Sequence, residues 1–308
     1  MTAVAPAALA RQWSACRPVN VLGTLAPLRR GPGDLAHRVD PDGTFWWACH
    51  TPAGPGTLAV RAVADGARAD AWGAGAAWLL DRLPALLGDG DDWSAVDVAA
   101  WPRLRDAQRA NTGVRLPATG LVLDSLVPAV LEQRVTGTEA HTAWRGLLRR
   151  FGTVAPGPRA DLFVPPGPRE LLDVPAWGWH RLGVDGKRQR AIRAAATVAR
   201  RLEECVMMPA AAAMARLRVV PGVGEWTAAE TALRAFGDPD AVSVGDFHLA
   251  DLVVHALTGR ARGTDAQMLD LLVPWAGQRA RVVRLIELSG VTPPKFGPRF
   301  APNDIRRI

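Results

Sequence analysis

Cysteine is scarce in this chain, and its positions exclude two classes of structure. The three cysteines, Cys16, Cys49 and Cys205, form no C-x-x-C pair, and the six histidines occur singly. A disulfide scaffold needs more paired cysteines, and a zinc site or an iron–sulfur cluster needs ligands at close, regular spacing. We therefore expect no iron–sulfur cluster and no tightly held cofactor.

The chain also lacks a long apolar run. No stretch reaches the roughly 18 residues that a membrane-spanning helix requires. Residues 1–19 show no charged segment followed by an apolar one, as a signal peptide would. With 308 residues, 48% of them hydrophobic and 22% charged, the composition is that of a globular protein with room for two domains. We expect a cytoplasmic protein without a membrane partner.

Lysine is nearly absent, and arginine carries the positive charge. Only Lys187 and Lys295 are lysines among 37 basic residues, against 30 acidic ones. Residues 1–112 hold 11 basic and 11 acidic side chains, and residues 113–308 hold 26 and 19, so the net charge of +7 lies in the second part. This excess favours an anionic partner such as nucleic acid, but the arginine codons of a GC-rich genome explain it equally well.

The spacing of apolar residues predicts an α+β domain over residues 1–112. Short apolar stretches at 44–49, 57–63 and 68–72 alternate with Gly, Pro and Asp turns between residues 21 and 72. This pattern predicts antiparallel hairpins. Residues 75–87 carry apolar side chains at helical spacing, which predicts a helix that covers one side of the sheet.

The remaining residues, 113–308, predict an all-α domain. The apolar residues recur three and four positions apart in eight segments. These predicted helices span residues 121–134, 139–151, 186–204, 210–216, 225–236, 247–257, 265–273 and 278–288. Two Pro- and Gly-rich segments, 155–169 and 291–302, predict an internal loop and a C-terminal extension.

Two of the predicted helices flank a short glycine-containing segment. It lies in the run Leu217-Arg218-Val219-Val220-Pro221-Gly222-Val223-Gly224-Glu225-Trp226-Thr227. Glycines two positions apart allow a sharp turn and let a phosphate approach the backbone amides. The amides at the start of the following helix also bind phosphate oxygens well. Taken alone, the pattern is also typical of an ordinary helix–helix turn with a glycine cap.

Neighbouring residues extend this pattern into a family resemblance. Trp226-Thr227-Ala228 follow the hairpin, and Asp246 comes 20 residues after Trp226. The chain here resembles the helix-hairpin-helix DNA glycosylase superfamily, and within it the bacterial 3-methyladenine DNA glycosylase II family. The family pattern is an L-P-G-hydrophobic-G hairpin, a W-T-A helix and an Asp that opens the next helix. Residues 131–136, 182–187 and 274–275 are similar to further motifs of this family, so the resemblance covers about residues 113–290.

The resemblance implies an enzyme of base excision repair that acts on double-stranded DNA. Such an enzyme flips the damaged nucleotide out of the stack and breaks its N-glycosidic bond, with positive charge developing on the sugar. A carboxylate beside the sugar stabilises this charge and orients or deprotonates the attacking water. Asp246 is the candidate for this catalytic role. It directly precedes the helix predicted at 247–257, so it is also a candidate N-cap, and one residue can serve in both ways.

The residue after the hairpin predicts the type of glycosylase. Bifunctional glycosylase-lyases cleave the DNA backbone through a Schiff base, which needs an amine nucleophile. In their pattern this amine lies two positions after the second glycine of the hairpin, where this chain has Trp226. Neither lysine is near the hairpin in sequence. We expect a monofunctional enzyme whose product is an abasic site.

The expected base pocket departs from the family pattern. Trp226 can stack on a flipped, positively charged base, although in a chain with 12 tryptophans a core position is as common. Phe247 stands where the family commonly has Tyr, and Glu230 and Arg284 stand at two further aromatic positions. We expect Glu230 either to pair with Arg284 or to face a cationic or hydrogen-bonding base, because an unpaired buried carboxylate is costly. An alkylated base is the first expectation, and the sequence does not fix it.

The hairpin is expected to hold the DNA backbone. Its DNA-contacting residues would bind phosphate without reading the base sequence. These residues are Pro221, Gly222, Val223, Gly224 and Thr227. The resemblance also implies a monovalent cation on the carbonyls of Arg218, Val220 and Val223.

A second DNA contact is expected at Gln133 and Arg134. Arg134 stands where the related enzymes insert an apolar wedge into the gap left by the flipped base. A planar guanidinium can fill that gap by stacking, and a solvated surface arginine is an equally common alternative.

Two hypotheses of different class therefore remain. The first is a monomeric DNA glycosylase in the cytoplasm, associated with the nucleoid. The second is a helix-hairpin-helix protein that binds DNA without excising bases, because its pocket has lost aromatic residues. Asp246 favours the enzyme, since a pure DNA-binding protein has no use for a carboxylate close to phosphates.

Overall fold

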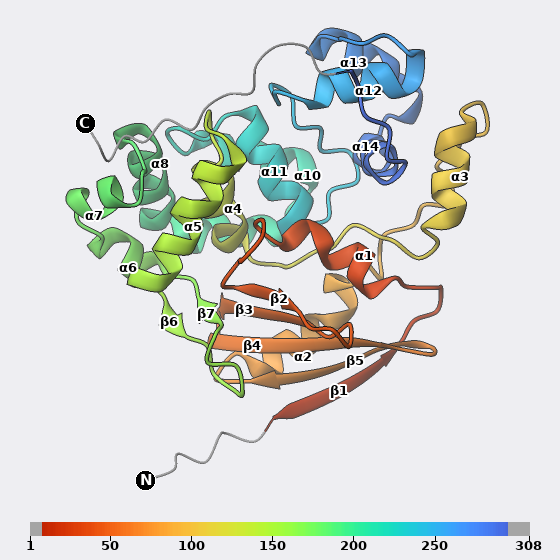
Figure 1. Ribbon diagram of the computed structural model, residues 1–308. Helices are drawn as coiled ribbons and strands as arrows, with labels where there is room; N and C mark the ends of the chain where they lie inside the picture. The colour runs from red at the N-terminus through yellow and green to blue at the C-terminus, as the bar shows by residue number, and fades with distance from the viewer. Residues whose placement is uncertain (1–7, 295–308) are drawn as a thin grey trace.

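An antiparallel sheet of five strands forms one side of the protein (Figure 1, a computed structural model that describes residues 8–294). Its strand order is β1-β5-β4-β3-β2. The strands are β1 (Leu9–Ser14), β2 (His37–Val39), β3 (Phe45–Thr51), β4 (Gly54–Val63) and β5 (Gly66–Trp72). The hairpins predicted for β3, β4 and β5 are confirmed, with Phe45 opposite Val60 and Val60 opposite Ala69.

Helices cover the sheet and join it to the rest of the protein. Helix α2 (Ala76–Leu86), predicted at 75–87, buries Leu79 and Leu83 against strands β1, β4 and β5. The segment from Val21 was expected to begin the hairpins, but it forms the short helix α1 (Val21–Leu25) and the 3-10 turn η1 (Ala26–Leu28). The side chain of Asn20 caps α1 by accepting a hydrogen bond from the Gly23 amide at 2.8 Å.

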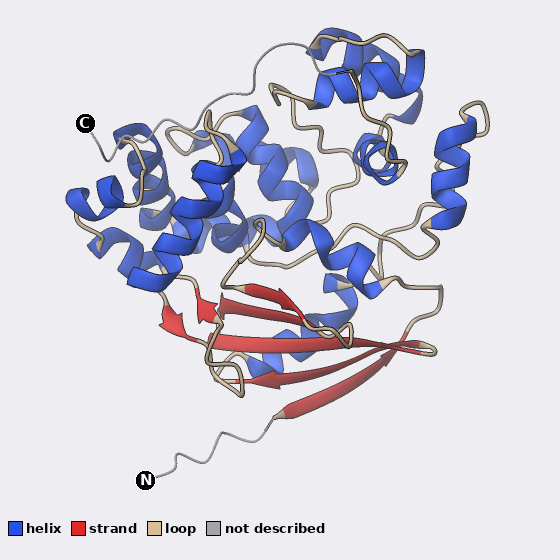
Figure 2. Ribbon diagram, viewed as in Figure 1, coloured by secondary structure: helices blue, strands red, loops and turns tan. Residues whose placement is uncertain are grey.

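The helical part lies on the other side of α1, as Figure 2 shows. Helix α4 is at its centre, and nine of its ten residues are buried, because it packs against α5, α8, α9 and α11. The other elements are arranged around it. In chain order they are α3 (Pro102–Ala110), α4 (Val122–Leu131), α5 (Gly137–Phe151), β6 (Thr153–Val154), β7 (Phe163–Val164), α6 (Pro168–Asp173), α7 (Ala176–Arg181), α8 (Gly186–Thr197), α9 (Ala199–Glu203), η2 (Glu204–Met207), α10 (Ala210–Val219), α11 (Glu225–Ala235), α12 (Leu249–Thr258), α13 (Asp265–Leu272), η3 (Val273–Trp275) and α14 (Arg279–Leu288).

The α+β class is confirmed, and each of the eight predicted helices has a counterpart in the structure. Helices α3 and α7 and the β6–β7 pair have no counterpart in the prediction, and three of the predicted segments differ in detail. The helix predicted at 186–204 is two helices that meet at Val198, the loop predicted at 155–169 contains β7 and the start of α6, and α12 begins at Leu249 instead of residue 247. The proposed C-terminal extension, 291–302, lies mostly outside the described residues, as does Lys295.

The division of the chain at residue 112 stays a prediction, and part of the segment before residue 112 packs with the last helices of the chain. Trp101 and Leu104 share a hydrophobic core with helices α12 to α14, and Trp101 lies 4.7 Å from Trp275 between ring centroids. Helix α3 therefore packs beside α14 and away from the sheet (Figure 1). Among residues 8–294, no helix has the length and apolar character needed to cross a membrane.

Candidate functional site

The hairpin between α10 and α11 is built around a glycine that no other residue can replace without strain. Gly222 has a φ of +87°, and a Cβ at this position would lie 2.7 Å from the Cβ of Ala191. Gly224 is different, because a Cβ there would meet no atom within 4 Å. Gly222 therefore serves the close packing of the hairpin on α8, whereas Gly224 leaves the surface open at the start of α11.

The hairpin presents backbone to solvent. Pro221, Gly222 and Gly224 are exposed, while the side chain of Val223 is buried, so Val223 can only offer backbone atoms to DNA. No side chain caps the N-terminus of α11, which leaves its first amides available to an anion. The carbonyl of Val220 accepts a hydrogen bond from the Val223 amide at 3.0 Å, and a carbonyl oxygen has a second lone pair for a cation.

The loop after α4 is attached to the hairpin by Gln133. Its side-chain amide donates to the Gly222 carbonyl at 2.9 Å and to the Thr227 hydroxyl at 2.7 Å. Thr227 is only 2% exposed. The bond between these two side chains places the α4–α5 loop beside the hairpin, and their DNA contacts stay a prediction.

Arg134 occupies an unusual backbone conformation at the tip of this loop. Its φ of +53° makes it the one non-glycine residue with a positive φ among residues 8–294. The left-handed region costs an L-residue about 1–2 kcal/mol. The loop is fixed on both sides, by Gln133 and by the capping box of Thr136 and Glu139 that starts α5. Arg134 is exposed, so its side chain projects from the surface beside the hairpin.

Asp246 lies between α11 and α12 and accepts three hydrogen bonds. One carboxylate oxygen accepts from the amides of His248 at 2.8 Å and Leu249 at 3.0 Å, which are at the start of α12. The other oxygen accepts from the indole N–H of Trp226 at 3.0 Å. The carboxylate thus binds the backbone just before and at the first residue of α12, whose N-cap is His248, and it also faces α11. The three hydrogen bonds hold the carboxylate in one orientation, and the residue is partly exposed at the surface.

Two of the predicted pocket residues adjoin Asp246 in different ways. Trp226 uses its indole N–H on the carboxylate, so stacking is no longer the sole explanation for a tryptophan here. Phe247 is 73% exposed, and its ring packs edge-on against the ring of His248, with 4.8 Å between the ring centroids. Both residues therefore lie beside the candidate catalytic group.

The expected pairing of Glu230 with Arg284 is wrong. The Glu230 carboxylate pairs with Arg234 at 2.7 Å, one turn further along α11, and it accepts a hydrogen bond from the Ser243 hydroxyl at 2.5 Å. Burial alone would raise the pKa of Glu230, but the Arg234 guanidinium and the Ser243 hydroxyl outweigh it and hold the pKa below its usual value. Arg284 pairs instead with Glu287 at 2.9 Å and reaches the Gly23 carbonyl at 3.4 Å.

Ser243 has a role that the sequence alone did not indicate. It lies three residues before Asp246 and bonds to a helix that precedes it in the chain. Only the i,i+4 spacing of Glu230 and Arg234 gave a local signal for part of this arrangement.

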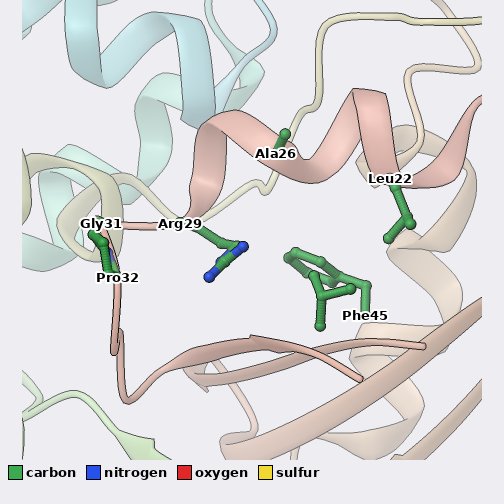
Figure 3. A pocket seen from close by; sticks show the side chains of 7 residues that line it. Leu22, Ala26, Arg29, Gly31, Pro32 and Phe45 are labelled. Atoms are coloured by element: carbon green, nitrogen blue, oxygen red, sulfur yellow. The ribbon is translucent and has the colours of Figure 1, made fainter. Parts of the chain in front are cut away.

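Two cavities are found in the described part of the chain. The larger, of about 540 Å³, is drawn in Figure 3 between α1–η1 and the sheet, with Arg29 and Phe45 pointing into it. The second, of about 340 Å³, is at the start of α4, where Asp124 and Glu203 line it. Neither is lined by a predicted site residue. Within residues 8–294, no group of three or more His, Cys, Asp or Glu side chains could hold a metal ion.

Known proteins that are similar to this chain in sequence or in fold include DNA repair enzymes. No protein-family model matches the chain. Its sequence is 30% identical over 199 residues to the probable bifunctional transcriptional activator/DNA repair enzyme AlkA of Mycobacterium tuberculosis. The match covers 61% of this chain and 38% of that relative, so the chain spans well under half of the relative's length.

Solved structures show the same fold over nearly the whole chain. A 3-methyladenine DNA glycosylase from Archaeoglobus fulgidus has a TM-score of 0.73 at 14% identity and covers 91% of this chain and 99% of its own. The apo form of the 8-oxoguanine glycosylase/lyase of Clostridium acetobutylicum has a TM-score of 0.68 at 9% identity, with coverages of 92% and 99%.

Proposed function

We propose that this chain, which has the fold of the helix-hairpin-helix DNA glycosylases, is a monofunctional DNA glycosylase of base excision repair. The observation that carries the proposal is the carboxylate of Asp246, held by the indole of Trp226 and by the backbone amides of His248 and Leu249. This group lies 20 residues after Trp226, which follows an exposed hairpin with the features of a phosphate-binding turn.

Asp246 would act on the sugar of a flipped nucleotide. As the N-glycosidic bond breaks, positive charge develops on the sugar, and an oriented carboxylate stabilises it. The same carboxylate can orient or deprotonate the water that attacks the sugar. Three hydrogen bonds keep the carboxylate in place before substrate binds, so little reorganisation is needed during the reaction.

The proposal of a monofunctional enzyme rests on Trp226. Similar folds include a glycosylase/lyase, so the fold is compatible with either activity. A lyase needs an amine nucleophile, whereas the residue that faces Asp246 is an indole. Lys187 is in the first turn of α8, and its backbone N–H donates to the side chain of Asp185 at 2.8 Å. Trp226 therefore favours hydrolysis, with an abasic site as product.

DNA binding would combine the hairpin and the Arg134 loop. The exposed backbone at Gly222 and Gly224 suits phosphate oxygens, and the uncapped start of α11 adds favourable amides. A monovalent cation on the carbonyls of Arg218, Val220 and Val223 would add positive charge there. Replacement of potassium by lithium in the buffer would test it: weaker DNA binding supports the cation, and equal binding opposes it.

A DNA-binding protein without excision activity is the second candidate. It is favoured by Glu230 and Arg284, which are paired with their own neighbours where the related enzymes have aromatic residues. The base pocket would then offer only Trp226 and Phe247, among the predicted pocket residues, as stacking surface.

Base release from damaged duplexes separates the two candidates. Duplexes with one alkylated, deaminated or oxidised base are incubated with excess protein, the free bases are measured, and alkali then cleaves any abasic sites. We expect release of an alkylated purine and strand cleavage only after alkali. Cleavage without alkali would refute the monofunctional assignment, and binding without release of any base would favour the second candidate.

A further inference from the structure

We infer that Glu230 is a positioning residue that fixes the loop carrying Asp246, and that it does not contact the flipped base. The inference rests on the proposed function, because Asp246 is the group being positioned. It assigns Glu230 and Ser243 to the same structural unit as Trp226 and Asp246.

Helix α11 holds this loop at two points. Trp226 and Glu230 are one helical turn apart and so share a face of α11. Trp226 donates to Asp246 at 3.0 Å, and Glu230 accepts from Ser243 at 2.5 Å. The Asp246 amide donates to the Ser243 carbonyl at 3.1 Å, which closes the turn between the two contacts. The loop is therefore fixed at both ends of its turn.

The Glu230 carboxylate has no oxygen left without a partner. One oxygen accepts from Ser243 and the other from Arg234, and the side chains of Glu230 and Arg234 are 15% and 16% exposed. Turning this carboxylate toward a base would break both bonds in a mostly desolvated place, which is costly. A role in base recognition is therefore the less favourable use of Glu230.

Arg234 connects this unit to the N-terminal part of the protein. Its guanidinium donates to the Pro27 carbonyl at 3.0 Å, in η1, as well as to the carboxylate of Glu230. Arg30, nearby, adds a second positive charge that acts on Glu230. Through Arg234, the carboxylate of Glu230 thus links three segments that are distant in the sequence: η1, α11 and the Asp246 loop. A neutral aromatic residue at position 230 could not make these bonds.

The test compares three variants with a matched control. Ser243→Ala removes the loop contact and keeps the ion pair, Glu230→Ala removes both, and Glu230→Gln keeps one acceptor for two donors. The control is Glu203→Ala, which removes another partly buried carboxylate that accepts from the amides of Val122 and Leu123 at 2.8 and 2.9 Å. Glu203 is distant from the Asp246 loop in the sequence and has no contact with it among the described hydrogen bonds.

Two measurements are made on each variant. Single-turnover base release and DNA affinity give the split between catalysis and binding. Amide hydrogen exchange of residues 241–249 without DNA reports the order of the loop whether or not the protein excises bases. We expect kcat to fall about tenfold in Ser243→Ala and further in Glu230→Ala, with unchanged DNA affinity and faster exchange of the loop. Glu230→Gln should lie between wild type and Glu230→Ala.

The contrary outcomes are distinct. A normal exchange rate of the loop in both alanine variants overturns the inference, even if wild-type protein releases no base. A kcat loss that depends on which damaged base is used, with Ser243→Ala behaving as wild type, shows that Glu230 contacts the base. Lowered thermal stability with normal kcat, as expected for Glu203→Ala, shows a merely structural carboxylate. If exchange responds as expected but wild type excises nothing, the positioning role stands and the proposed function fails.

Discussion

The substitution Asp246→Asn isolates the charge of the candidate catalytic group while keeping its shape. In the wild type, one carboxylate oxygen accepts from the amides of His248 and Leu249, and the other accepts from Trp226. An asparagine has one acceptor oxygen and one donor nitrogen. If its oxygen stays with the two amides, its NH₂ group faces the indole N–H of Trp226, and two donors oppose each other.

The structure therefore sets the size of the expected stability change. One charge-assisted hydrogen bond is lost and one indole N–H is left unpaired, which costs about 1–3 kcal/mol at a mostly buried position. The group at residue 246 is partly exposed, so water can satisfy part of this loss and the lower end of the range is expected. The variant should remain folded under assay conditions, because a domain of this size has about 5–15 kcal/mol of stability.

The effect on activity should be much larger. Loss of a positioned base or of a preorganised charge typically lowers the rate about 10²–10⁴-fold. We expect a loss in this range in single-turnover base release at saturating protein. DNA affinity, measured by fluorescence anisotropy, should be unchanged or higher, because a negative charge near the phosphates has been removed.

Trp226→Phe is the matched control for this experiment. It removes the indole hydrogen bond but keeps the Asp246 charge and an aromatic ring. We expect a loss of about tenfold or less, which is the rate equivalent of one hydrogen bond. Full activity of Asp246→Asn would refute the catalytic assignment. Equal losses in both variants would show that the reaction depends on the orientation of the carboxylate and not on its charge.

Three further predictions test the proposed DNA-binding surface and the partly exposed carboxyl of Asp124. Gly224→Glu should weaken binding to all DNA sequences alike, by about tenfold at low salt. Gly224→Ala should leave binding unchanged, because a Cβ there meets open space, and weaker binding by this variant would contradict the proposed phosphate contact. Arg134→Ala should slow excision from paired DNA more than from mismatched DNA. Arg134→Gly should have the same effect on excision and should raise the free energy of unfolding by about 1 kcal/mol, because glycine adopts a positive φ without strain. Equal losses on both substrates would refute the hypothesis that Arg134 is a wedge. Burial raises the pKa of Asp124 to about 7, with the Glu203 carboxylate adding to the shift. The contribution of protonated Asp124 to the free energy of unfolding is therefore complete below about pH 4 and lost as the pH rises through 7. Asp124→Asn should thus resist urea better than wild type at pH 8 and equally well at pH 4. Urea midpoints that change with pH in the same way in both proteins would contradict this.

The sequence predicted the elements that rest on local signals. Turn residues bounded strands β3 to β5, and helical spacing indicated α11, because both signals come from residues close together in the chain. Strand β1 was missed, since it is defined by pairing with β5, with Leu9 opposite Ala71. Such a long-range partner leaves no local trace. The short helix α1 was also missed, although Asn20, which caps it, gave a signal.

The candidate site was predictable in its parts and not in its connections. The motif indicated the hairpin, Trp226 and Asp246, but not that the indole of Trp226 donates to the carboxylate of Asp246. Nor did it indicate the positive φ of Arg134, which depends on how Gln133 and the capping box of α5 fix the loop. These features arise from tertiary packing, which a pattern of residue types does not encode.

Glu230 shows why a position in a family pattern does not by itself give a role. As a substitute for an aromatic residue it is predicted to be part of the base pocket, either paired with Arg284 of α14 or facing a cationic or hydrogen-bonding base. An acidic residue four positions before a basic one on the same helix already provides the preferred orientation for an ion pair, and Arg234 supplies it. Because that local pairing neutralises Glu230 on its own helix, the second oxygen is free to bind the Ser243 hydroxyl. The bond to the Asp246 loop thus gives this departure from the family pattern a structural role, and a base bound beside Asp246 would meet charge pairs where the related enzymes have aromatic rings.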